Sequence, residues 1–127
     1  MPAPVYFEVH VDDMARAKAF YGEVFGWRFT RNEWADIEYW FIETGEKDAM
    51  RGGMLPRPGT LQPFQPPSAF VVTLGVSSLD GTLEKALARG GIVAMAKFAI
   101  PGMGWQAYLI DSEKNVLGLF QPDDQAK

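Results

Sequence analysis

The sequence has no cysteine and a single histidine in 127 residues. The lack of thiols excludes disulfides, thiolate catalysis and thiolate metal sites. The 16 acidic residues outnumber the 12 basic ones, and no run of Lys or Arg occurs, which argues against nucleic acid or an anionic membrane as a partner. No apolar stretch approaches the ~18 residues of a membrane-spanning helix, and no signal-peptide pattern follows Met1. We therefore expect a cytoplasmic protein.

An internal repeat organises the chain. A shift of 65 residues, from Val11 to Val76, also places Asp13 on Ser78 and Gly26 on Gly91. Self-similarity at one fixed period indicates two related halves, and this length favours one domain with a substantial core. We expect a single domain over 1–127: a first module at about 4–55, a proline-rich linker at about 56–67, a second module at about 68–121, and a polar, frayed tail at 122–127.

The first half has the pattern of a strand, a helix and three further strands. Apolar and polar residues alternate over Val5–Val11, which predicts a strand with an apolar back and a front carrying Tyr6, Glu8 and His10. Asp12 and Asp13 are helix-capping residues, and apolar spacing continues to Gly26, a typical C-cap. The strands expected after this helix are Trp27–Thr30, Glu38–Glu43 and Met50–Leu55.

The second half repeats this order. A strand is expected at Ala69–Gly75, Ser78 is the predicted cap, and a helix follows whose apolar stripe is Leu79, Leu83, Ala86 and Leu87. The later strands are expected at Ile92–Phe98, Gln106–Ile110 and Asn115–Phe120. The fold class is therefore α+β, with two tandem βαβββ modules.

Three segments carry a resemblance to a known family: Asp12–Trp27 with its Phe20-Tyr21 and Phe25-Gly26 pairs, Gly90-Gly91, and Asp111–Phe120. Together they resemble the vicinal oxygen chelate superfamily, which includes lactoylglutathione lyase (glyoxalase I), extradiol dioxygenases, fosfomycin-modifying enzymes and bleomycin resistance proteins. The resemblance covers roughly residues 4–121. It implies cupped mixed sheets that enclose a cleft, and a homodimer that covers the edge strands.

The resemblance also implies where the superfamily's enzymes hold a divalent metal. The four ligand positions fall on Tyr6, on Gly52 or Gly53, on Val71 and on Gly118. Glycine and valine have no side-chain donor, and a tyrosine phenol has a pKa near ~10. We therefore expect no metal and no other cofactor.

Glu8 and His10 form the alternative chemical site. They project from the same strand face as Tyr6, at i and i+2, so that they could form half of a metal site or a carboxylate-oriented imidazole base. A lone histidine is more often structural, and strand glutamates such as Glu38 and Glu43 are usually only solvated. Glu8 and His10 are kept as the catalytic candidates.

The remaining cleft lining is expected to be aromatic and apolar, which suits a flat or apolar small molecule. Gly118 fits a close backbone approach, and the segment Pro101–Trp105 is either a mobile lid or an ordinary hairpin loop. The residues predicted to bind a ligand are Tyr6, Trp40, Val71, Thr73, Met103, Trp105, Gly118 and Phe120.

Three functions remain open. The leading one is a glyoxalase-like small-molecule-binding protein, or a metal-independent enzyme of unknown reaction, that uses the cleft between the modules. The alternative is a metal-dependent lyase or isomerase of the lactoylglutathione lyase type with an unusual site at Glu8 and His10. The third is a structural or partner-binding module, favoured if Trp40, Phe120 and Met103 fill the cleft. The expected partners are a small molecule and a second copy of the chain.

Overall fold

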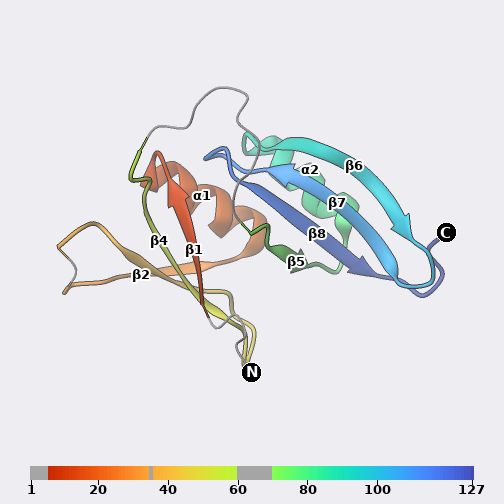
Figure 1. The fold of residues 1–127 in the computed structure, drawn as a ribbon, viewed down its shortest axis with the longest axis horizontal. Coiled ribbons are helices and arrows are strands. Elements are labelled where there is room, and N and C mark those ends of the chain that lie inside the picture. Colours follow the sequence, from red (N-terminus) through yellow and green to blue (C-terminus); the bar gives the residue numbers. More distant parts are fainter. Residues whose placement is uncertain (1–5, 35, 60–69) are drawn as a thin grey trace. The chain divides into compact units, whose positions relative to one another are not determined.

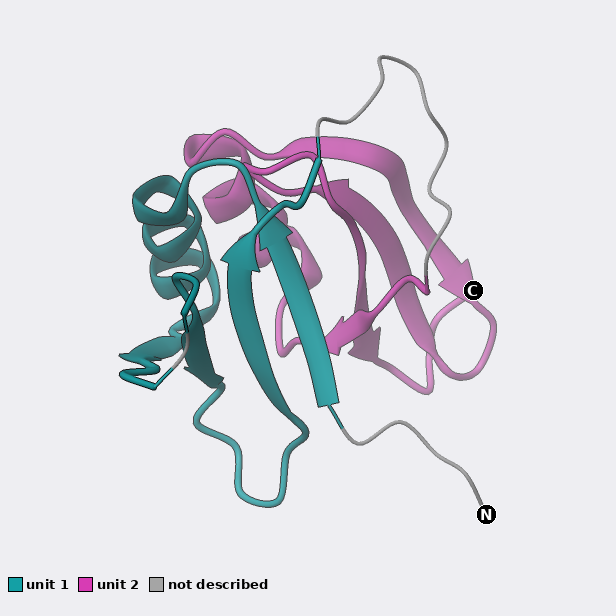
Figure 2. Ribbon diagram, turned by 60° about the vertical axis from the view of Figure 1, so that its left-hand side comes forward, with its two compact units in different colours: residues 1–61 teal, residues 62–127 magenta. Residues whose placement is uncertain are grey.

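The computed structural model describes residues 6–34, 36–59 and 70–127, which include all helices and strands named below. The chain divides into two compact units, residues 1–61 and 62–127 (Figure 2). Val5, Ala69 and most of the expected proline-rich linker lie outside the described residues. Neither helix among the described residues is long and apolar enough to cross a membrane.

The first unit is a βαβββ module. It consists of β1 (Tyr6–Val11), α1 (Met14–Phe25), β2 (Arg28–Arg31), β3 (Trp40–Glu43) and β4 (Arg51–Pro56), shown in red to yellow in Figure 1. The sheet order is β1-β4-β3-β2. The pair β1 and β4 is parallel, and β4 with β3 and β3 with β2 are antiparallel.

Local signals set the ends of α1 as the sequence predicts. The Asp13 side chain accepts a hydrogen bond from the Arg16 backbone N–H at 3.0 Å, which satisfies one of the free donors of the first turn. Gly26 ends the helix in the left-handed conformation with φ of 75°, which glycine adopts without steric cost. The buried face consists of Ala17, Phe20, Tyr21 and Val24.

Aromatic rings fill the space between α1 and its sheet. Tyr21 stacks on Trp27 with ring centroids 4.8 Å apart, and Phe7 from β1 contacts the same indole at 5.7 Å. A Cβ at Gly52 would clash with the Phe7 ring, so β4 needs a glycine where this ring crosses it. The helix side of this sheet is therefore an aromatic core.

The second unit repeats the topology. It consists of β5 (Thr73–Gly75), α2 (Leu79–Ala88), β6 (Ile92–Ile100), β7 (Gly104–Ile110) and β8 (Val116–Pro122), shown in green to blue in Figure 1. The sheet order is β5-β8-β7-β6, again with one parallel pair, β5 and β8. The predicted fold class, two βαβββ modules, is confirmed.

The core of the second unit is aliphatic. Its buried apolar side chains near α2 and the sheet are Leu79, Ala86, Ala107, Leu109, Leu117 and Leu119. Leu87, expected in the helix stripe, is 53% exposed, so the buried stripe is narrower than predicted. The first strand is also shorter than predicted, because Val71 and Val72 precede β5.

The 65-residue repeat is a repeat of structure. Ser78 caps α2 by accepting from the Gly81 N–H at 3.1 Å, at the position equivalent to Asp13. Gly91 follows α2 as Gly26 follows α1, and a Cβ at Gly91 would clash with the Ala86 carbonyl. Asp13 and Ser78 therefore cap the two helices in the same way, whereas the positive φ that Gly26 supplies directly after α1 occurs at Gly90 after α2.

The residues after β8 are held in place, contrary to the expected frayed tail. Ala126 is buried, and its carbonyl accepts a hydrogen bond from the Gly102 N–H at 3.0 Å. The Asp123 N–H donates to the Met103 carbonyl at 2.9 Å. The same bonds tie down the turn between β6 and β7, so in this structure it is a braced hairpin turn.

Candidate functional site

The first sheet has an apolar face that packs against α1 and an opposite face that carries polar side chains. The β1 to β4 register pairs Glu8 with Gly53 and Tyr6 with Arg51, and β3 adds Phe41 opposite Gly53. Because side chains alternate along strands, these residues share the face opposite to Phe7, Gly52 and Ile42. We call this face, with Tyr6, Glu8, Gly53 and Phe41, the polar face.

Three side chains on the polar face form a hydrogen-bonded group. The Tyr39 hydroxyl donates to Glu8 Oε2 at 2.8 Å, and the Tyr6 and Tyr39 hydroxyl oxygens lie 2.7 Å apart. Tyr6 and Glu8 come from one strand, and Tyr39 reaches them from the position just before β3. We call these three residues the phenol–carboxylate relay.

Gly53 makes room for this relay. A Cβ at this position would overlap the Tyr39 hydroxyl and its ring. The phenol therefore lies directly over the β4 backbone, between Glu8 on one neighbouring strand and Phe41 on the other. The Tyr39 ring also meets the Phe41 ring edge-on, with centroids 5.6 Å apart.

The environment of Tyr39 keeps its phenol protonated. Burial raises the pKa of Tyr39 far above its ordinary value, and the hydrogen bonds to Tyr6 and Glu8 raise it further. The phenolate would lose its bond to the Glu8 carboxylate and would repel that charge. Tyr39 therefore acts here as a hydrogen-bond donor to Glu8.

Sequence reasoning missed Tyr39 because it chose the wrong side of the third strand. Trp40 was expected to face the cleft with Tyr6, but it lies on the helix side, where Lys18 Nζ sits 3.3 Å from the ring centroid. The indole donates to Glu38 at 3.1 Å. The available signal was the alternation Tyr39, Phe41, Glu43, which places the two aromatic residues on one face.

The second unit has a glycine at the equivalent place, but with different neighbours. Gly118 on β8 pairs with Thr73 on β5, and a Cβ at Gly118 would clash with the Thr73 hydroxyl and the Gln106 amide. Gln106 is buried and donates to Thr73 Oγ1 at 3.4 Å. The predicted residue Phe120 shares this sheet face, with its ring over Gly104.

Other predicted ligand residues of the second unit lie elsewhere. Trp105 pairs with Gln121, so it projects from the side of β7 opposite to Gln106 and Phe120. Its indole donates to Asp123 at 3.0 Å, and Lys97 lies over its ring. Met103, in the braced turn, and Val71, before β5, are exposed. A shared role in ligand binding for these residues stays a prediction.

Asp123 accepts the hydrogen bond from the Trp105 indole. Its pKa lies below the ordinary range, first because the Gln125 N–H donates to the carboxylate and next because of the Trp105 indole. Lys97 also bonds Asp80 at 3.2 Å. The Trp105 indole thus joins β7 to the residues after β8, and Lys97 joins β6 to α2, which is a structural role for Trp105.

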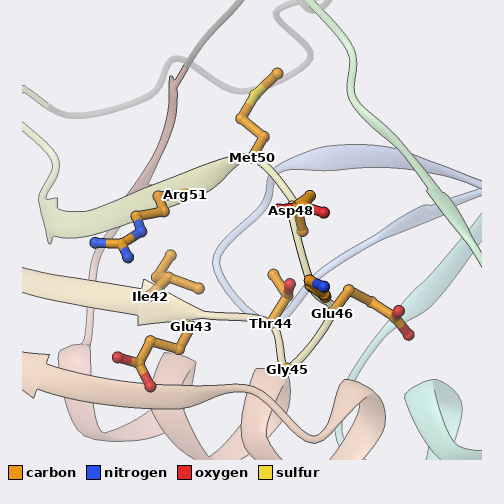
Figure 3. Close-up of a pocket in the computed structure, with 10 residues that line it drawn as sticks. Ile42, Glu43, Thr44, Gly45, Glu46, Asp48, Met50 and Arg51 are labelled. Atoms are coloured by element: carbon orange, nitrogen blue, oxygen red, sulfur yellow. The ribbon is translucent and has the colours of Figure 1, made fainter.

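The β3 to β4 hairpin surrounds a hollow of about 630 Å³ (Figure 3). Its walls are ten consecutive residues, Ile42–Arg51, and the turn uses positive φ at Gly45 and Asp48. Figure 3 shows the Glu46 side chain directed away from Glu43 and Arg51, so the charged groups do not converge. This hollow follows from the path of the turn and gathers no set of functional groups.

A comparison of the sequence with models of protein families finds one match. The family model for the bleomycin resistance protein-like N-terminal region matches residues 4–45, which include the whole relay. The two βαβββ units described above are the architecture that the sequence resemblance implied. The chain has the fold of the vicinal oxygen chelate superfamily.

Solved structures with this superfamily fold match nearly the whole chain. A glyoxalase/bleomycin resistance protein/dioxygenase family enzyme from Burkholderia phytofirmans is 20% identical with a TM-score of 0.72, covering 94% of this chain and 98% of its own. The fosfomycin resistance protein FosX from Listeria monocytogenes is 14% identical with a TM-score of 0.72, covering 97% and 95%. TnmS3, an antibiotic binding protein from Streptomyces sp., is 25% identical with a TM-score of 0.65, covering 97% and 98%. No curated protein matches the sequence.

The divalent metal that the sequence resemblance implies does not fit the residues of this chain. Of the two β4 candidates, Gly53 shares the face of Tyr6, and Tyr39 fills the space over it. At Gly118 the Thr73 and Gln106 side chains fill that space. Among the described residues no three His, Asp or Glu side chains are grouped as a metal site would need, so Glu8 and His10 gain no third donor there.

Proposed function

We propose that this protein is a small-molecule-binding member of the superfamily, and that the polar face of the first sheet is part of its binding surface. The observation that carries the proposal is the relay itself: two polar side chains from β1 and one from the residue before β3 meet over a glycine, beside exposed aromatic surface. Binding sites combine apolar contact area with a few placed polar groups in this way.

The relay presents exposed ring surface and a fixed hydroxyl, which the packing of the sheet alone does not require. Tyr6 and Phe41 remain 41% and 38% exposed, so they offer ring surface to a ligand beside the half-buried Tyr39 phenol. The Tyr39 hydroxyl is held at both ends, which fixes the orientation of the ring that it carries. Such preorganised groups bind ligands with a smaller loss of side-chain entropy.

The relatives give this proposal its context. One solved structure with the same fold is described as an antibiotic binding protein, and the family model that matches residues 4–45 is named after bleomycin resistance. A binder needs shape and placed polar groups, and it can work without the ligand positions that are glycine or valine here. The proposal therefore favours binding over metal-dependent lyase chemistry at Glu8 and His10.

Nuclear magnetic resonance tests the proposal. The ¹⁵N-labelled full chain is titrated with 2-phenylethanol, an aromatic ring with one small polar group, up to millimolar concentration. We expect amide shifts concentrated at Tyr6–Glu8, Tyr39–Phe41 and Gly53, and a loss of these shifts in the Phe41→Ala variant. Leu87→Ala, on the exposed side of α2, is the control that should leave the shifts unchanged. Shifts absent from the polar face, or located only elsewhere, would refute the proposal.

A further inference from the structure

The relay contains a fixed number of protons, and their positions can be assigned. A tyrosine hydroxyl carries one proton, and a carboxylate only accepts. The Tyr39 proton is given to Glu8 Oε2. The Tyr6 and Tyr39 oxygens, 2.7 Å apart, still share a hydrogen bond, so the proton in that bond comes from Tyr6.

The direction of the relay is therefore Tyr6 to Tyr39 to Glu8. Both phenolic protons are used inside it. What remains for a ligand is the lone pairs of the Tyr6 oxygen and the second oxygen of Glu8, and all of these are acceptors. Because Tyr6 is 41% exposed, its oxygen can be reached from outside.

A ligand that offers only acceptors meets a penalty at this group. Its oxygen would face the Tyr6 oxygen or the Glu8 carboxylate with no proton between them, and turning the Tyr6 hydroxyl outward would break the bond to Tyr39. A ligand with a donor loses nothing. Each unmade hydrogen bond of a desolvated polar group costs more than a made one gains.

We infer that the relay makes this site selective for aromatic ligands that carry a hydrogen-bond donor, such as a hydroxyl, amide N–H or ammonium group, over those with an ether, carboxylate or phosphonate. This inference rests on the proposed function, because it names the ligand class of the same surface. It is specific to the chain's own residues Tyr6, Tyr39 and Glu8.

Matched probes test it. In the methyl ether of 2-phenylethanol a methyl group replaces the hydroxyl proton, which removes the donor, and phenylacetate replaces the donor by an anion. In the wild-type chain, amide shifts of Gly53 and Phe41 should give the alcohol about fivefold tighter binding than either other probe, the ratio expected for one net hydrogen bond. Equal affinity of the alcohol and the ether, or preference for phenylacetate, would overturn the inference while leaving the binding function intact.

Variants test whether the relay, and not its neighbouring residues, sets the ratio of alcohol to ether affinity. Tyr39→Phe frees the Tyr6 proton to point outward, so the ether should gain affinity and the alcohol-to-ether ratio should fall toward one. Glu8→Gln should lower the same ratio, and it serves if Tyr39→Phe fails to fold. Leu87→Ala, on the exposed side of α2 and outside the polar face, should keep the ratio of the wild type. An unchanged ratio in both relay variants contradicts the inference, and a lack of shifts on the polar face with all three probes refutes the proposed function as well.

Discussion

The two units share a topology and differ in what surrounds one glycine. In the first unit Gly53 lies under the phenol of Tyr39, which is held by Tyr6 and Glu8. In the second, Gly118 lies under an amide and a hydroxyl, Gln106 and Thr73. The common feature is the missing side chain on the last strand. The shared topology therefore leaves space over a glycine in both units. The residues on the neighbouring strands determine which polar groups fill that space.

The helix sides of the two sheets differ in the same sense. Around α1 the core is aromatic, with Phe20, Tyr21, Phe7 and Trp27 in contact, whereas the core around α2 is aliphatic. Large rings bury more area for each residue, and their preferred edge and stacked contacts add stability. We therefore expect the first unit to be more sensitive to loss of a single side chain.

The largest change in the free energy of unfolding should come from truncating a buried side chain in the aromatic core. Phe20→Ala removes a fully buried ring and should lower the free energy of unfolding by ~3–5 kcal/mol, while Leu79→Ala in the second unit should cost ~2–5 kcal/mol. Chemical denaturation followed by circular dichroism measures both. Leu87→Ala, an exposed position of α2, is the control and should stay within ~0.5 kcal/mol of wild type. A near-neutral Phe20→Ala would contradict the aromatic core.

An intermediate effect should follow from filling the two glycine positions. Gly53→Ala forces the Tyr39 phenol aside, and Gly118→Ala displaces Thr73 and Gln106, so each should cost ~1–3 kcal/mol of unfolding free energy by overpacking. Only Gly53→Ala should also remove the preference for 2-phenylethanol over its methyl ether.

Gly75→Ala is the matched control for these two variants, because a Cβ at Gly75 meets nothing within 4 Å. Its stability should equal or slightly exceed that of the wild type, since alanine loses less backbone entropy than glycine on folding. Equal stability of all three variants would show that the two glycines leave free space, and the comparison of the units would then lose its basis.

Much of the fold could be predicted from the sequence because its signals are local. Asp13, Ser78 and Gly26 mark helix ends through contacts within one turn, and the shift of 65 residues relates the two halves before any tertiary contact is known. The stabilised tail was not predictable in this way. Ala126 is held by Gly102, a bond between residues whose proximity depends on the β6 to β7 hairpin.

The site was predicted in part. Tyr6, Glu8 and His10 were assigned to one face from strand alternation, and the register of β1 agrees with this, whereas the resemblance left Gly52 and Gly53 as alternatives. Tyr39 and Trp40 are adjacent aromatic residues at the start of a short strand, and a shift of one residue exchanges their faces. Cross-strand register decides between them, because Phe41 pairs with Gly53, and register cannot be read from one strand alone.

The smallest change in the free energy of unfolding should come from removing one hydrogen bond over each glycine. The two losses should differ in how they depend on pH. Tyr39→Phe should lower the free energy of unfolding by ~0.5–1.5 kcal/mol at neutral pH, the range for a lost hydrogen bond. The pKa of Tyr39 is raised on folding, so the folded chain keeps a proton that the unfolded chain releases above pH ~10. The advantage of the wild type over Tyr39→Phe should therefore be constant below that pH and shrink above it. Thr73→Val breaks the bond in the second unit without a titrating group, so its deficit should not change with pH. Urea denaturation between pH 7 and 11 checks both, and a Tyr39→Phe deficit that stays constant or grows above pH 10 would contradict a neutral phenol in the relay.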